Sequence, residues 1–155
     1  METNYTWKTK FFRNKYVIFQ NEMPAGELKG SGLKRIATGE LKGNKVQFEA
    51  RGLFGHKFQI IDPGDNTVIG EITLKTWRRK ASITLLNKSY NFQFDSFFHR
   101  KWSIGNENGY LIKYESGFKK GIIVSYTGDE VLILTGLYIR DFIRQRSAAI
   151  AAAAS

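Results

Sequence analysis

Residues 131–139 form an apolar run that constrains the fold of this chain more than any other segment. If this segment forms a helix, with about 100° between successive residues, its apolar side chains point in every direction and form no single stripe. These side chains belong to Val131, Leu132, Ile133, Leu134, Leu137, Tyr138 and Ile139. A helix that lies on a sheet has one apolar stripe, whereas a helix that is apolar all round is buried all round. We therefore expect strands to wrap around this helix.

The sequence also predicts where this helix starts and that it does not cross a bilayer. Residues 127–130 fit a capping box, with Thr127 as the cap and Glu130 reaching back to it. The apolar run ends at Arg140, far short of the roughly 20 residues that span a bilayer. We predict a helix over 130–146. Gly136 in its middle costs about 1 kcal/mol relative to alanine, so we expect it to allow close approach by a side chain of the surrounding wall.

The residues before the helix alternate between apolar and polar side chains, as strands with one dry and one wet face do. The predicted strands cover residues 5–11, 16–20, 33–38, 45–50, 57–61, 67–75, 81–86, 90–94, 100–104, 110–114 and 118–126. Turn residues lie between them, and both Pro24 and Pro63 are assigned to turns. Gly70 interrupts the alternation, which favours a bulge or a tight bend. No internal repeat is visible.

These patterns predict an all-β protein: a closed antiparallel barrel of about 10–12 strands around a central hydrophobic C-terminal α-helix. Closure would also remove exposed sheet edges. The barrel and its central helix form one domain over residues 1–146. Residues 147–155 form an alanine-rich tail, which either continues the helix into solvent or frays.

Composition and charge limit the classes of partner. The 155 residues include no cysteine, so neither a disulfide framework nor a thiolate metal site is available. The formal net charge of +10 favours an anionic partner: a membrane surface, an acidic protein or a nucleic acid. A basic surface without such a partner is the alternative. The N-terminal residues lack a signal-peptide core, so we expect a cytoplasmic protein that associates peripherally with membranes.

Several segments carry a resemblance to a known family. Residues 64–72 are similar to a turn-plus-strand run of the form D-x-x-G-x-x-I-G, and residues 77–83, 90–92 and 102–104 and the helix from Val131 follow in order. Over residues 16–146 the chain resembles the tubby C-terminal superfamily, which includes tubby-like proteins, phospholipid scramblases and LURP-one-related proteins. The resemblance implies a barrel with a membrane or lipid role. The chain is short for this group and lacks both a cysteine-rich palmitoylation segment and an acidic calcium loop, so scrambling is not implied.

Residues with catalytic or metal-binding chemistry are sparse. His56 and His99 have no carboxylate cluster near them in the sequence, and we expect both to be structural. Asp62 and Asp65 flank a turn, which explains them better than metal binding does. Residues 30–35 (Gly-Ser-Gly-Leu-Lys-Arg) open no helix, so a hairpin connection explains them better than an anion-holding nest of amides. We expect no enzyme, no catalytic residue, no metal and no cofactor.

The best functional lead is a basic segment between Ile72 and Trp102. Its seven cations, against the single acid Asp95, are Lys75, Arg78, Arg79, Lys80, Lys88, Arg100 and Lys101. Trp77, Phe97 and Phe98 lie beside them, and residues 78–80 are expected to be exposed at a hairpin tip.

The lead hypothesis is a non-catalytic binding or scaffolding module that binds anionic phospholipid headgroups with these seven cations. The alternative is a protein-interaction module with an acidic partner, and nucleic-acid binding is a more distant third. A further interpretation is that the aromatic rings point inward and the charges are merely solvated.

Overall fold

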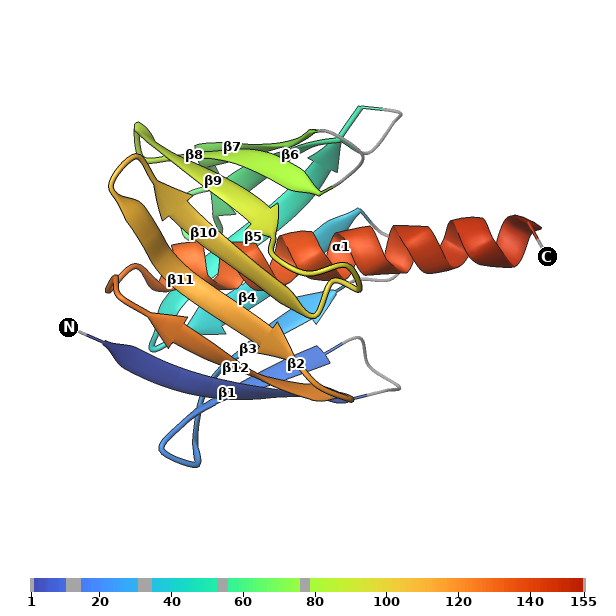
Figure 1. Cartoon of the computed structure of the whole chain (residues 1–155). Coiled ribbons are helices and arrows are strands. Elements are labelled where there is room, and N and C mark those ends of the chain that lie inside the picture. Colours follow the sequence, from blue (N-terminus) through green and yellow to red (C-terminus); the bar gives the residue numbers. More distant parts are fainter. Residues whose placement is uncertain (1, 11–14, 31–34, 53–55, 76–78, 155) are drawn as a thin grey trace.

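The strands close into a single antiparallel barrel, as predicted from the sequence (Figure 1). The computed structural model describes residues 2–10, 15–30, 35–52, 56–75 and 79–154. The twelve strands of this part are β1 (Thr3–Lys10), β2 (Lys15–Gln20), β3 (Met23–Gly30), β4 (Ile36–Leu41), β5 (Asn44–Arg51), β6 (Lys57–Asp62), β7 (Thr67–Lys75), β8 (Lys80–Leu85), β9 (Lys88–Phe94), β10 (Lys101–Asn106), β11 (Gly109–Ser116) and β12 (Lys120–Ser125). Each strand pairs with its neighbours in the chain, and β1 pairs with β12 to close the barrel.

Strand β3 is the element that the sequence did not predict. Its residues, MPAGELKG, include one proline and two glycines and show no alternation of apolar and polar side chains. Pro24, which was assigned to a turn, lies inside this strand opposite Phe19. The register between β2 and β3 shifts at this point, and such irregularities are where a sheet tolerates a proline, which cannot donate a backbone hydrogen bond.

Helix α1 (Glu130–Ala154) runs through the centre of the barrel and leaves it at one end (Figure 1). Nine consecutive residues, 132–140, are buried, which requires a wall on every side of the helix. This confirms the helix predicted to be buried all round. Of the two alternatives for the alanine-rich tail, the structure shows the first, because the helix continues beyond residue 146 to Ala154. The good helix propensity of alanine explains this continuation.

The helix is capped differently from the prediction. Asp129, not Thr127, is the cap, because its Oδ1 accepts a hydrogen bond of 3.0 Å from the amide of Leu132. The hydroxyl of Thr127 instead accepts from the amide of Asp129 at 3.3 Å. An aspartate at this position satisfies one of the four unpaired helix amides and also places negative charge at the positive end of the helix.

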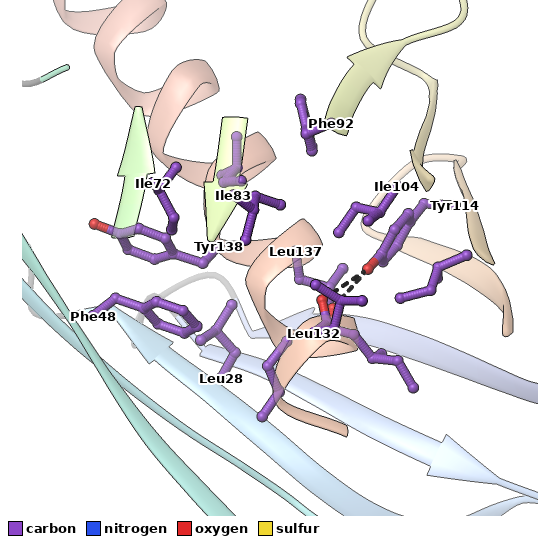
Figure 2. Packing of buried hydrophobic residues seen from close by; sticks show 14 of the residues in the cluster. Leu28, Phe48, Ile72, Ile83, Phe92, Ile104, Tyr114, Leu132, Leu137 and Tyr138 are labelled. Carbon is purple, nitrogen blue, oxygen red and sulfur yellow. Dashed lines mark hydrogen bonds between the residues drawn. The ribbon is translucent and has the colours of Figure 1, made fainter. Parts of the chain in front are cut away.

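The wall side chains pack closely on the helix, as Figure 2 shows for Tyr114 and Tyr138. The Tyr114 hydroxyl donates a 2.8 Å hydrogen bond to the carbonyl of Ile133. A Cβ atom at Gly136 would overlap the Tyr114 ring, so the predicted close approach at this glycine is confirmed. Tyr138 stacks on Phe48 with ring centroids 4.4 Å apart. Strands from opposite sides of the barrel therefore meet through α1.

The barrel contains a threefold internal repeat of four strands, which the sequence did not reveal. In β3, β7 and β11 one residue is skipped in the register with the preceding strand: Ala25, Ile69 and Leu111. The carbonyl of each skipped residue accepts a backbone hydrogen bond from just beyond the next strand. The bulge predicted near Gly70 is the second of these three. The repeat units are β2–β5, β6–β9 and β10–β12 with β1, so β1 completes the third unit.

The two ends of the barrel are distinct. We call the end where α1 leaves the exit mouth; strands β1, β3, β5, β7, β9 and β11 end there, and the strand that follows each of them begins there (Figure 1). We call the opposite end, where α1 begins after β12, the entry end.

Candidate functional site

Most residues of the predicted basic segment lie at the exit mouth. Lys75 and Lys80 are register partners at the end of β7 and the start of β8. Arg79 directly precedes β8, and Arg100 and Lys101 lie at the start of β10. All except Arg79 are exposed.

Two members of the predicted set do not belong to this group. Arg78, together with the neighbouring Trp77, lies outside the described residues. Lys88 lies at the entry end, as the register partner of Leu85. The five residue steps of β8 between Lys80 and Leu85 amount to about 17 Å of strand, or roughly two Debye lengths in physiological salt. Lys88 therefore cannot join the same local anion site as Lys80.

Arg79 is not a solvated charge at a hairpin tip. It is half-buried, and its Nη2 donates a 3.0 Å hydrogen bond to the carbonyl of Ser96. Its guanidinium carbon also lies 6.0 Å from the ring centroids of Phe94 and Phe97. These contacts tie the β7–β8 connection to the β9–β10 connection, so Arg79 has a structural role.

The aromatic residues of the segment divide between the exterior and the core. Trp102 is fully buried, whereas Phe97 and Phe98 are 88% and 83% exposed. Phe118, in the neighbouring β11–β12 connection, is 82% exposed. Large apolar side chains this exposed on a loop are unusual, and three of them adjoin the cations of the exit mouth.

A cleft of about 690 Å³ lies at the exit mouth beside α1. Its walls come from β1, β2, the β9–β10 and β11–β12 connections and α1. Among the described residues, the lining contains one acid, Asp141, and six cations: Lys10, Lys15, Arg100, Lys119, Arg140 and Arg144. Only Arg100 was among the predicted site residues. The others were missed because four separate segments supply them, and only closure of the barrel by β1 brings these segments together.

Arg140 is the most unusual of these residues, because it is only 4% exposed. Its guanidinium carbon lies 4.7 Å from the Trp102 ring centroid and 5.9 Å from that of Trp7. Its Nε donates a 3.3 Å hydrogen bond to the carbonyl of His99. Its Nη1 is buried and has no hydrogen-bond partner among the described residues. Burial, and next the charge of Arg144, lower the pKa of Arg140 to about 10, so the side chain stays cationic at neutral pH.

Tyr16 and the charge of Asp141, the next residue, oppose this lowering of the Arg140 pKa only in part. Oδ1 of Asp141 accepts a 2.6 Å hydrogen bond from the Tyr16 hydroxyl, and its Oδ2 accepts one of 2.7 Å from Nε2 of Gln145. Within the described part of the chain, no ion pair joins Asp141 to Arg140. Burial raises the pKa of Asp141, while the Tyr16 hydrogen bond and the nearby arginines oppose this shift.

The entry end has the opposite charge. The acids at or next to its turns and the start of α1 are Glu2, Glu22, Asp62, Asp65, Glu107, Asp129 and Glu130. In the described part of the chain, the cations closest to these turns are Lys42, Lys45 and Lys88. The positive charge of the protein is therefore concentrated at the exit mouth.

The two histidines lie apart from any metal-binding group. His99 packs on the Phe94 ring with centroids 4.2 Å apart, and the carbonyl of His56 accepts a hydrogen bond from the amide of Leu74. The described residues contain no cluster of three or more side chains suited to hold a metal ion. Within the same residues, no helix is both long and apolar enough to cross a membrane.

Comparisons of the chain with protein-family models, with curated proteins and with solved structures find no match. The resemblance to the tubby C-terminal superfamily accordingly stays a prediction.

Proposed function

We propose that this protein is a non-catalytic binding module that associates peripherally with anionic phospholipid surfaces through its exit mouth. One observation carries the proposal: exposed cations and three exposed phenylalanines share one end of the barrel, while acids gather at the other. An anionic surface would attract the first end and repel the second. A cytoplasmic protein with this charge distribution would meet the anionic inner leaflet of the cell membrane.

The magnitudes suit reversible attachment. Each cation held near an anionic leaflet contributes about 1 kcal/mol, so Lys75, Lys80 and Lys101 together would contribute about 3 kcal/mol. Phe97, Phe98 and Phe118 would add an apolar contribution by entering the headgroup region. The electrostatic part weakens with salt because exposed charges are screened over about 8 Å at physiological ionic strength, whereas the apolar part does not.

Helix α1 leaves the barrel at the same end. The eleven residues from Arg144 to Ala154 correspond to about 16 Å of helix, so a membrane docked here must accommodate this segment. Deletion of residues 147–155 determines whether the segment contributes to docking or obstructs it.

Co-sedimentation with liposomes across a salt series tests the proposal. The informative variant is the triple substitution Lys75→Gln, Lys80→Gln and Lys101→Gln, which leaves the structural Arg79 in place. The matched control changes the net charge equally at the entry end, by Lys42→Gln, Lys45→Gln and Lys88→Gln. We expect the first variant to lose about 3 kcal/mol of binding to anionic liposomes, more than a hundredfold, and the control to bind like the parent protein.

The outcomes separate the candidate functions. Equal losses in the two triple variants would show that net charge, and not the exit mouth, governs binding. If the parent protein does not bind anionic liposomes at low salt, the lipid hypothesis fails, and an acidic protein becomes the leading candidate for the partner of the exit mouth.

A further inference from the structure

We infer that the cleft beside the exit of α1 binds a phosphate monoester dianion, with Arg140 and Arg144 as its principal ligands. This inference deepens the proposed function, on which it rests where the phosphate belongs to a lipid headgroup. A soluble phosphomonoester offers the same chemistry, and the experiment below distinguishes the two sources.

The first argument is the burial of Arg140 without an ionic partner. Removing a charge from water costs several kcal/mol unless an opposite charge or a full set of hydrogen bonds replaces the water. Among the described residues no carboxylate forms an ion pair with Arg140, and its Nη1 has no hydrogen-bond partner. The faces of Trp7 and Trp102 offset part of the cost. A methionine would fill this space without that cost, so packing alone does not account for an arginine here.

The second argument is the repulsion between Arg140 and Arg144. Residues four apart on a helix are neighbours on its surface, and two like charges in this arrangement destabilise the helix. The charge of Arg144 is one of the causes that lower the pKa of Arg140. An anion bound between the two guanidinium groups would convert this repulsion into two favourable interactions.

The third argument is the charge of the whole cleft, which favours a dianion over a single carboxylate. The six cations and one carboxylate of the described lining residues give a formal charge of +5. Lys15 forms a 2.7 Å ion pair with Glu27, which neutralises one of the six. The remaining excess still exceeds the charge of a phosphate monoester, about −1.5 to −2 at neutral pH. The planar fork of a guanidinium also matches phosphate oxygens in a bidentate arrangement.

The fourth argument is size and surroundings. At about 690 Å³ the cleft is within the range of small-molecule sites and leaves room for the group that carries the phosphate. Trp7, Phe98 and Phe118 provide apolar surface in the same lining. Asp141, the one carboxylate among the described lining residues, accepts hydrogen bonds from Tyr16 and Gln145.

Titration calorimetry and thermal denaturation of the full chain test the inference with glycerol phosphate and inorganic phosphate as soluble probes. Saturable binding with a rise in Tm is expected for the parent protein. Arg144→Gln removes an exposed charge, so it should fold normally and bind at least tenfold more weakly. Arg140→Met should abolish binding without loss of stability. Lys45→Gln, the control, removes an exposed cation at the entry end that does not line the cleft, and this variant should bind like the parent protein.

Vesicles then distinguish the source of the phosphate. A lipid ligand predicts that the parent protein prefers vesicles with phosphatidic acid over vesicles with phosphatidylserine, and that Arg140→Met loses this preference while still binding both. A soluble ligand predicts saturable binding of glycerol phosphate with no such preference.

Three results would overturn the inference: no saturable phosphate binding together with no preference for phosphatidic acid, unchanged binding by both arginine variants, or binding of an acidic peptide alone. Failure of the proposed function is a separate result. In that case glycerol phosphate would bind the cleft, but neither kind of vesicle would bind the exit mouth.

Discussion

The substitution Gly136→Ala tests how closely the barrel wall fits the central helix. In the helix interior alanine is more favourable than glycine by about 1 kcal/mol, so propensity alone predicts stabilisation. The structure predicts the opposite. A Cβ atom at this position would lie 2.7 Å from Cε1 of Tyr114 and closer still to its Cζ and hydroxyl oxygen. The overlap is with a ring fixed on both sides, not with the end of a flexible chain.

Two contacts hold the Tyr114 ring in place. It stacks on Trp102, with centroids 5.2 Å apart and planes 5° from parallel, and its hydroxyl donates to the carbonyl of Ile133. Burial raises the pKa of Tyr114, so the hydroxyl stays protonated and needs its acceptor. The overlap would cost about 1–3 kcal/mol, and loss of the buried hydrogen bond about another 1–3 kcal/mol. After the gain of about 1 kcal/mol in helix propensity, we expect Gly136→Ala to destabilise the fold by about 1–5 kcal/mol.

Urea unfolding of the parent and variant measures this difference through the transition midpoint, provided that the slope is unchanged. Gly128→Ala is the matched control, because a Cβ atom there would meet nothing within 4 Å; its effect should stay within about 0.5 kcal/mol. The double variant Gly136→Ala with Tyr114→Leu should cost less than the two single changes added together, by about 1 kcal/mol or more. If Gly136→Ala is as stable as the parent, the wall does not contact the helix as described.

Three further perturbations test the core and its pH dependence. Leu134→Asp should abolish folding, seen as loss of a cooperative thermal transition, because it places a carboxylate in a fully buried site at a cost of several kcal/mol; an unchanged Tm would contradict the central helix. Deletion of residues 147–155 should leave Tm nearly unchanged, whereas deletion of 131–155 should give an aggregating barrel, and equal stability would refute the same arrangement. Burial and then the nearby arginines lower the pKa of His99 below 6.5, so stability should fall as pH drops below about 6.5, and His99→Asn should flatten this dependence.

The barrel and its helix were predictable because side-chain pattern alone carries them. A helix that is apolar on every side must be buried on every side, and alternating strands supply the wall. Strand β3 was not predictable in the same way, since backbone pairing and not side-chain alternation defines it. The threefold repeat could not be recognised from the sequence for a similar reason. It consists of equivalent bulges and backbone hydrogen bonds, which place few demands on residue identity.

The cleft was the least predictable feature. The apolar run ends at Arg140, and nothing in the sequence indicated that this charged residue is buried. The indole faces of Trp7 and Trp102 allow a guanidinium to remain buried, an interaction that joins residues far apart in the sequence. The net charge of the chain indicated an anionic partner, but it could not show that β1, β2 and α1 contribute most of the cations around this position.

The repeat also shows where the third unit departs from the first two. Arg35 and Arg79 occupy equivalent places in the first two units, and each donates from Nη2 to a carbonyl seventeen residues further on, those of Gly52 and Ser96. In these units the chain continues directly from the third strand to the fourth. In the third unit β12 leads into α1 instead, and the fourth place is taken by β1 from the other end of the chain. This difference in connectivity lies at the entry end, where α1 begins, whereas the cleft lies at the exit mouth, between β1 and the departing helix.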